Sequence, residues 1–478
     1  MAQPARVGSH KLRIDRISGA RAVLGSQQPR KDSAWQIFLA RLLSDMLRAE
    51  DGSRSARVAR FRRPLRPVYA QCSGALFLLF LLLAPHGLKA DDASANLPRV
   101  FLLDPKHLHD TRERLRAGDK TFQSALAALE RDARDALKAG PYSVMSKDRL
   151  PPSGDKHDFM SQAPYYWPDT NSPDGKPYIR RDGERNPEIY NLSDRGSLGR
   201  LIGTVETLSI AYYFTTNEAY AEKAAAFLRT WFLDTATRMN PNFEFAQAVP
   251  GANTGRGTGL IETAGLTSLV DAVGLLAESN AWTKKDQEGL QDWFSHFLQW
   301  MQESKNGRAE AAAKNNHGSY YDLQVVCFSL FVGKTDVARN IFEEVKQKRI
   351  ARQIEPDGRQ PLELERTRAW SYSIFNLRAL FSLASVGERS GVDLWHFETP
   401  DGRSIRKALD FLIPFALKDK KWPYRQLGQF PNEDLFPLIR QAAVKYPERQ
   451  YKGLLPKLRP IDSASRTRLL QKSAEESR

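Results

Sequence analysis

The sequence contains few cysteines, few histidines and only a short apolar run. Two cysteines in 478 residues exclude a disulfide-held fold and a zinc site built on several thiolates. The eight histidines are scattered without an H-E-x-x-H motif, so we expect no catalytic metal and no cofactor. The apolar run Ala75–Ala84 is too short for a membrane-spanning helix, which needs about 20 residues. With 41% hydrophobic and 27% charged residues, the composition excludes wholesale disorder and a polytopic membrane protein.

The net charge of +15 is concentrated in the first ninety residues. Residues 1–90 carry 16 Lys and Arg against 5 Asp and Glu, whereas residues 91–478 carry 55 against 51. Basic residues precede the apolar run, which is followed by Leu88-Lys89-Ala90. This order predicts a leader over residues 1–90, with a signal peptide whose apolar core lies at about 75–84. We therefore expect a periplasmic or secreted protein without stable membrane insertion after leader removal; a short membrane anchor or a disordered basic arm is the alternative.

Helical patterns dominate residues 91–450, and long alternating Val- and Ile-rich strands do not occur. The helices expected here fall at residues 111–139, 197–215, 217–234, 260–278, 284–304, 320–332, 337–347, 366–386 and 404–417. Pairs of helices joined by short links predict an all-α domain of stacked helical hairpins, arranged as a toroid or a solenoid. The polar segment 451–478 is expected to be a flexible tail.

Two irregular stretches interrupt the helices and draw attention to function. Residues 142–192 are rich in Pro, Gly, Asp and aromatic residues, and residues 240–259 contain four closely spaced glycines. Long loops inside a compact domain are usually functional.

A third segment, Asn315-Asn316-His317-Gly318, lies at the expected start of a helix. Polar side chains and backbone N–H groups there suit an anion such as a carboxylate. The alternative is an ordinary helix cap with a satisfied histidine. His157, the Tyr165–Trp167 triplet and Arg256 have equally ordinary alternatives: a surface histidine, a packing plug and a loop closure.

Five segments taken together resemble a known family. They are SGDKHDFMSQAPYYWPD, PYIRRDGERNPE, AQAVPGANTGRGTGLIE, NNHGSYYDLQ and ELERTRAWSYSIFNL, and they resemble the alginate-lyase domain family of polysaccharide lyases. The resemblance covers about residues 98–450. It implies an (α/α) toroid over residues 91–450, with long functional loops and a groove for an acidic polysaccharide, and cleavage of a uronic acid polymer by β-elimination.

The resemblance also implies site residues. Asn316 matches the residue that neutralises the substrate carboxylate, and His317 shares that task or acts as the base. Tyr372 matches the general acid, with the base role open to it as well. Because a free tyrosine has a pKa of about 10, Tyr372 needs a cationic neighbour to act as a base near neutral pH. Arg366, or else Arg368, would supply that charge.

Further residues of these segments are candidates for binding the sugar chain. Aromatic faces stack on sugars, and basic or amide side chains pair with uronates. The substrate-binding candidates are Lys156, His157, Tyr165, Tyr166, Trp167, Gln247 and Arg256.

Other functions remain open at this stage. A glucuronan lyase would use the same mechanism. A toroidal glycoside hydrolase would need two opposed carboxylates, for which Asp155, Asp158 and Glu262 are available. A non-catalytic polysaccharide-binding protein is a third possibility. A nucleic-acid partner is not expected, since the chain after the leader has no concentrated basic segment.

Overall fold

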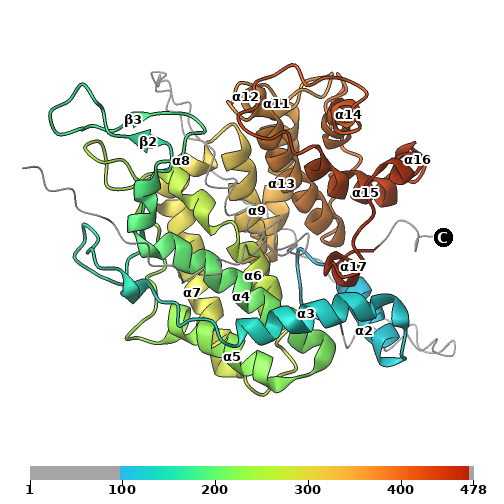
Figure 1. Ribbon diagram of the computed structural model, residues 1–478, viewed down its shortest axis with the longest axis horizontal. Helices are drawn as coiled ribbons and strands as arrows, with labels where there is room; N and C mark the ends of the chain where they lie inside the picture. The colour runs from blue at the N-terminus through green and yellow to red at the C-terminus, as the bar shows by residue number, and fades with distance from the viewer. Residues whose placement is uncertain (1–96, 473–478) are drawn as a thin grey trace, which may run out of the picture. The chain divides into compact units, whose positions relative to one another are not determined.

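A computed structural model describes residues 97–472 as a largely helical fold, shown in Figure 1, which confirms the predicted fold class. The first helices are α2 (Pro105–Arg116), α3 (Gln123–Ala136), α4 (Ser193–Thr215), α5 (Glu218–Leu228), α6 (Leu266–Gly274), α7 (Lys284–Glu303), α8 (Lys305–Ala311) and α9 (Asn316–Phe331). The later ones are α10 (Thr335–Val345), α11 (Ala351–Gln353), α12 (Pro361–Leu364), α13 (Ala369–Arg389), α14 (Ile405–Ala416), α15 (Phe436–Lys445), α16 (Tyr451–Leu454) and α17 (Thr467–Leu470).

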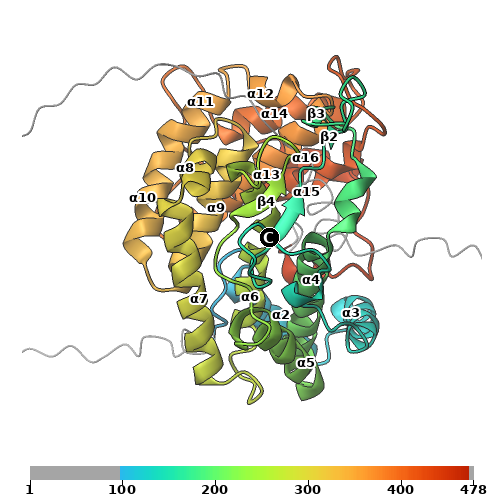
Figure 2. The ribbon, with the colours of Figure 1, turned by 90° about the vertical axis from the view of Figure 1, so that its left-hand side faces the viewer.

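Four helices form an inner row. Helices α4, α6, α9 and α13 each pack against the next. All but one of the 16 residues of α9 are buried, and a helix buried on every side lies within a core. Helices α7 and α10 bury only one face and lie on the outer side of α9, as Figure 2 shows. An inner and an outer layer of paired helices make an incomplete helical barrel.

Two small sheets organise the long loop between α3 and α4. Strand β1 (Met160–Gln162) pairs in parallel with β4 (Phe245–Ala248), which joins the two irregular stretches. Strand β2 (Tyr166–Trp167) pairs with β3 (Ile179–Arg180) as an antiparallel hairpin. The predicted long loop is therefore ordered by strand pairing rather than by helices.

Two expected helices are interrupted in the structure. The helix expected over 111–139 is split into α2 and α3, because Gly118 takes a φ of +83° and Asp119 caps a new turn through Thr121. The helix expected over 260–278 begins as a 3₁₀-helix over Gly257–Thr263, and α6 follows.

The C-terminal segment differs from the flexible tail that its polar composition predicts. Residues 451–472 pack on the fold, with Tyr451, Leu469 and Leu470 buried. Arg466 donates from Nη2 to Asp132 at 3.1 Å and from Nη1 to Thr207 at 3.2 Å. A few apolar residues and one arginine therefore anchor a segment that is polar on average.

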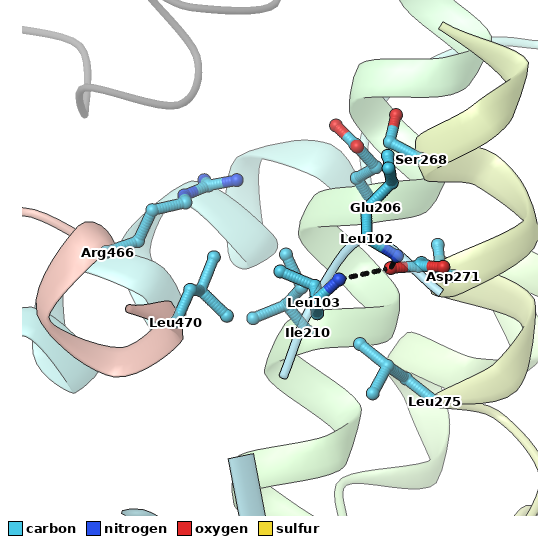
Figure 3. Close-up of a pocket in the computed structure, with 10 residues that line it drawn as sticks. Leu102, Leu103, Glu206, Ile210, Ser268, Asp271, Leu275, Arg466 and Leu470 are labelled. Atoms are coloured by element: carbon cyan, nitrogen blue, oxygen red, sulfur yellow. Dashed lines mark hydrogen bonds between the residues drawn. The ribbon is translucent and has the colours of Figure 1, made fainter. Parts of the chain in front are cut away.

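A small cavity of about 20 Å³ lies between this segment, α4 and α6. Figure 3 shows Arg466 and Leu470 on one side of it and Glu206, Ser268 and Asp271 on the other. The Asp271 carboxylate accepts three backbone N–H groups, from Phe101, Leu102 and Leu103, at 2.6–2.8 Å. The cavity thus lies where both ends of the described chain meet the inner helices.

Within residues 97–472, no helix is both long enough and apolar enough to cross a membrane. The predicted leader, residues 1–90, lies outside the described residues.

Candidate active site

The N-terminus of α9 holds the first two predicted catalytic residues. Asn315 is the N-cap, and its side chain accepts the N–H of His317 at 3.2 Å. Asn316 is fully buried and donates to the Glu363 carboxylate twice, from its backbone N at 2.7 Å and from Nδ2 at 2.8 Å. A carboxylate at a helix N-terminus is favoured by the helix dipole, so Glu363 both caps α9 and fixes the Asn316 amide.

His317 is 1% exposed and lies against a second carboxylate. Its Nδ1 is 2.5 Å from Oε1 of Glu310, which is also 1% exposed and comes from α8. The close approach of α8 requires Gly318, since a Cβ there would lie 2.2 Å from the Ala313 carbonyl oxygen. The glycine of the Asn-Asn-His-Gly motif therefore has a steric role beside the two polar residues.

Arg366 and Tyr372 are in contact at the connection from α12 to α13. Arg366 Nη2 donates to the Tyr372 hydroxyl at 3.2 Å, and its guanidinium lies 4.0 Å from the centre of the tyrosine ring. The hydroxyl of Tyr165 lies 3.1 Å from that of Tyr372. Of the two arginines considered from the sequence, Arg366 is the one whose side chain reaches Tyr372. Arg368 contributes its backbone to α13 and pairs with Gln426.

The β2–β3 hairpin brings Tyr165 to this place together with Asp182. The Arg181 N–H donates to the Tyr165 carbonyl at 2.7 Å, so residues on both sides of the hairpin are held together. The Asp182 carboxylate pairs with Arg366 at 2.5 Å and accepts from the backbone N and Oγ1 of Thr367. The long loop is thus fixed to the α12–α13 connection at the site.

Burial dominates the electrostatics of these groups. Burial, and then the neighbouring Tyr165, raise the pKa of Tyr372 well above its ordinary value, and Arg366 opposes this only in part. Burial raises the pKa of Glu363 as well, against the charge of Arg366 and the hydrogen bonds from Asn316. For Asp182 the balance is reversed, because the hydrogen bond and charge of Arg366 outweigh burial and lower its pKa. Tyr372 is therefore a neutral phenol that can donate a proton.

The four predicted catalytic residues come together through Glu363. It bonds Asn316 directly and interacts electrostatically with Arg366 and His317, while Arg366 contacts Tyr372. Fifty residues of chain separate the two halves of this cluster. The contacts of Glu363 and Arg366 therefore connect the start of α9 with the α12–α13 connection.

A second group of predicted substrate-binding residues makes contacts around Tyr166, the residue after Tyr165. The Arg256 guanidinium donates to the Gln247 side chain at 2.8 Å and to the Tyr166 hydroxyl at 3.3 Å, and it lies over the Tyr166 ring at 4.9 Å. The pairing of β1 with β4 explains how these distant segments meet. Trp167 donates from its indole to the Glu184 carbonyl, with Arg181 over its ring at 5.3 Å.

Lys156 and His157 belong to a different cluster. The Lys156 carbonyl accepts from the buried Lys147 ammonium at 2.7 Å. His157 Nδ1 lies 2.6 Å from the Arg238 carbonyl oxygen. The first contact lies within the long loop, the second joins that loop to the segment after α5, and neither involves the four predicted catalytic residues. The substrate-binding role predicted for this pair stays a prediction.

The three carboxylates that a glycoside hydrolase could use, Asp155, Asp158 and Glu262, have neighbours within the fold. Asp155 and Asp158 each accept a hydrogen bond from the Asn240 amide at 2.9 Å. Glu262 is buried, 3.8 Å from Arg195, and burial raises its pKa. Asp155 and Asp158 thus hold a loop together. Glu262 does not share this role.

Three site residues were missed from the sequence: Glu310, Glu363 and Asp182. Glu363 and Asp182 lie inside the segments that carry the resemblance, and Glu310 lies seven residues before His317. Nothing in the local sequence marks Glu310 and Glu363 as buried. For Glu363 and Asp182, the available signal was a carboxylate within a motif that also contains predicted site residues or arginines.

Among residues 97–472, no cluster of three or more His, Cys, Asp or Glu side chains has the arrangement to hold a metal ion.

Comparisons with known proteins bear on this arrangement. The family described as Alginate lyase matches residues 143–422, which is more than half of the chain and contains all four predicted catalytic residues. A search of curated proteins finds no match.

Solved structures with a similar fold include alginate lyases. The crystal structure of an alginate lyase from Bacteroides ovatus is 41% identical, has a TM-score of 0.76, and the match covers 78% of this chain and 99% of that one. Alginate lyase A1-III from Sphingomonas species A1 is 15% identical with a TM-score of 0.51, over 80% of this chain and 99% of that one. A tetrasaccharide complex of A1-III gives 16% identity and a TM-score of 0.51, with the same coverage. The chain belongs to the alginate lyase family and is a polysaccharide lyase.

Proposed function

We propose that the protein cleaves alginate by β-elimination at the Asn316–His317–Arg366–Tyr372 cluster. The observation that carries this proposal is the contact of Tyr372 with Arg366, beside an Asn-His pair held by Glu363. In the reaction, a base removes the C5 proton of a uronate, the C4–O4 bond breaks, and an acid protonates O4. The electron pair released from the C5–H bond becomes the C4=C5 double bond of the product.

Tyr372 is the proposed acid. Its raised pKa keeps the proton on the phenol oxygen, and departing O4 is the group that needs a proton. The same raised pKa makes phenolate costly, which leaves His317 as the better base. The second hydrogen of the Asn316 side-chain amide would stabilise the negative charge that develops on the C6 carboxylate, a contribution of about 3 kcal/mol for a well-placed donor.

Tyr165, Tyr166, Trp167, Gln247 and Arg256 are proposed to contact the neighbouring sugars. This proposal is supported by their position along the loop segments that meet at Tyr372. A substrate of uronates also explains why guanidinium groups and aromatic faces occur together here.

The test is ultraviolet absorbance, because the product's double bond is conjugated with its carboxylate. Polymannuronate, polyguluronate and glucuronan are each incubated with the full chain. Rising absorbance on either alginate block supports the proposal; absorbance on glucuronan alone assigns the enzyme to glucuronan instead. New reducing ends without absorbance would show hydrolysis and refute the elimination.

Two variants test the residue roles. Tyr372→Phe and His317→Ala should each lower kcat by about 100-fold or more, with the circular dichroism spectrum retained. The matched control is Tyr213→Phe, because Tyr213 is a buried tyrosine of α4 that lies against Arg112, away from this cluster. The control should keep near wild-type activity. Near wild-type activity in Tyr372→Phe would remove Tyr372 as the acid.

We also propose export to the periplasm or medium through the leader at residues 1–90. The basic segment before Ala75–Ala84 supports this proposal. Mass spectrometry of the protein purified from a periplasmic extract should find a mature N-terminus near residue 91. An intact leader on cytoplasmic protein would overturn it.

A further inference from the structure

His317 contacts a carboxylate, that of Glu310, which has no assigned role in the proposed reaction. Glu310 Oε1 lies 2.5 Å from His317 Nδ1, and both side chains are 1% exposed. A contact of this length between buried groups is a charge-assisted hydrogen bond. With Glu310 ionised, the hydrogen of this contact lies on Nδ1, because a carboxylate can only accept.

The tautomer of a neutral imidazole follows from that hydrogen. With Nδ1 protonated, the lone pair available to take another proton is on Nε2. A carboxylate behind an imidazole also makes the ring a stronger base, since it stabilises the imidazolium that forms. Glu310 is therefore placed to decide which nitrogen of His317 reacts and how strongly.

The construction of α8 supports a dedicated position for this carboxylate. α8 is a seven-residue helix, Lys305–Ala311, whose N-cap Ser304 accepts from Gly307. A Cβ on Gly307 would lie 1.8 Å from the Met301 carbonyl oxygen, and Gly318 on α9 leaves room for Ala313 just after α8. Gly307 thus lets α8 pack closely on the end of α7, and Gly318 lets the chain just after α8 approach the start of α9, where Glu310 meets His317.

Other charged groups around His317 do not replace Glu310. Glu363, from α12, interacts with His317 electrostatically, but both of its carboxylate oxygens accept hydrogen bonds from Asn316. Arg366 is paired with Asp182. Asp322, further along α9, forms a buried pair with Arg349 at 2.7 Å.

We infer that Glu310 is a positioning residue: it fixes His317 with the hydrogen on Nδ1, so that Nε2 is the base. This inference rests on the proposed function only for the identity of the reaction. The tautomer itself is a property of the free protein and can be measured without substrate.

The first experiment is ¹⁵N NMR of the imidazoles in the full chain, with His317→Ala to assign the signal. The inference expects a neutral His317 with a protonated Nδ1 and an unprotonated Nε2. The opposite tautomer would overturn it whether or not the protein cleaves alginate.

The second experiment compares Glu310→Gln with Glu206→Gln across the pH range. Glu206 is also a buried glutamate, but it faces Ser268, Asp271 and Arg466 at the cavity of Figure 3. Glu310→Gln should lower the plateau of kcat by about tenfold or more. It should also move the acid limb of the kcat/KM profile to lower pH by about one unit, because the neighbouring negative charge is lost.

Glu206→Gln should leave both the plateau and the acid limb unchanged. A role for Glu310 in folding alone would lower the amount of active enzyme without moving the limb. An unmoved limb in folded Glu310→Gln would therefore overturn the inference. If wild type gave no absorbance on any uronan, the proposed function would fail, and the NMR result would still decide the tautomer.

Discussion

Glu206 should make the folded protein less stable as the pH rises through neutrality. This glutamate of α4 is buried beside the cavity that Figure 3 shows, and burial, helped by the nearby Asp271, raises its pKa from 4.5 to about 7. The hydrogen bond from Ser268 and the charge of Arg466 oppose the shift without cancelling it. The folded protein therefore holds a proton that the unfolded chain has already released.

The magnitude and sign follow from that difference. Each pKa unit corresponds to about 1.4 kcal/mol, so ionising Glu206 in the folded state costs about 3 kcal/mol. Below pH 4.5 both states are protonated and the cost is absent. Between pH 4.5 and 7 the stability falls, and above pH 7 the full cost applies.

Glu206→Gln removes the ionisation and keeps the shape. Compared with wild type, the variant should gain about 3 kcal/mol of unfolding free energy between pH 4.5 and pH 8. Burial also raises the pKa of Asp271, to about 6. The stability that is lost when Asp271 ionises is lost in both proteins, so it cancels to first order in the comparison. Urea unfolding of both proteins at several pH values measures the difference. If the unfolding free energies of the two proteins changed with pH in parallel, the reasoning would be refuted.

Three further substitutions test the site and its support. Asp182→Asn weakens the pair with Arg366 and should lower kcat about tenfold to 100-fold, because the guanidinium is misplaced. The control Asp174→Asn, at an exposed position in the same loop, should not lower kcat. Equal activities of the two variants would contradict this. Gly318→Ala should lower the unfolding free energy by about 1–3 kcal/mol, because its Cβ would meet the Ala313 carbonyl at 2.2 Å. The control Gly203→Ala, in open space on α4, should instead stabilise by about 0.5–1 kcal/mol, and thermal melts that rank the two the other way would disprove the steric argument. Asp322→Asn should destabilise by about 3 kcal/mol because it leaves the buried Arg349 without its partner charge, and an unchanged melting temperature would count against it.

The helical fold could be predicted from local patterns because helices depend on contacts three and four residues apart. The helix expected over 320–332 begins earlier, at Asn316, where Asn315 caps α9 as its residue type suggests. The break at Gly118 was missed, since a single glycine in a helical pattern is often tolerated. The packed C-terminal segment was missed for a different reason: its few buried residues, such as Leu469 and Leu470, are diluted by charged neighbours.

The site was only half predictable. The resemblance identified Asn316, His317, Arg366 and Tyr372, which the structure links through Glu363. Tyr165 was predicted only as a sugar contact, yet its hydroxyl lies 3.1 Å from that of Tyr372. That contact depends on the β2–β3 hairpin, whose two-residue strands are too short to show a pattern in sequence.

The missed residues share a physical cause. Glu310, Glu363 and Asp182 are acidic residues in a site expected to bind an anion, so charge complementarity argues against them. Their function is directional rather than attractive: each accepts hydrogen bonds and so fixes the orientation of an imidazole, an amide or a guanidinium. Net charge cannot reveal this arrangement, and most of the +15 of the whole chain comes from residues 1–90 instead. An anion-binding site built from carboxylate-held donors becomes visible only when the partners of each donor are known.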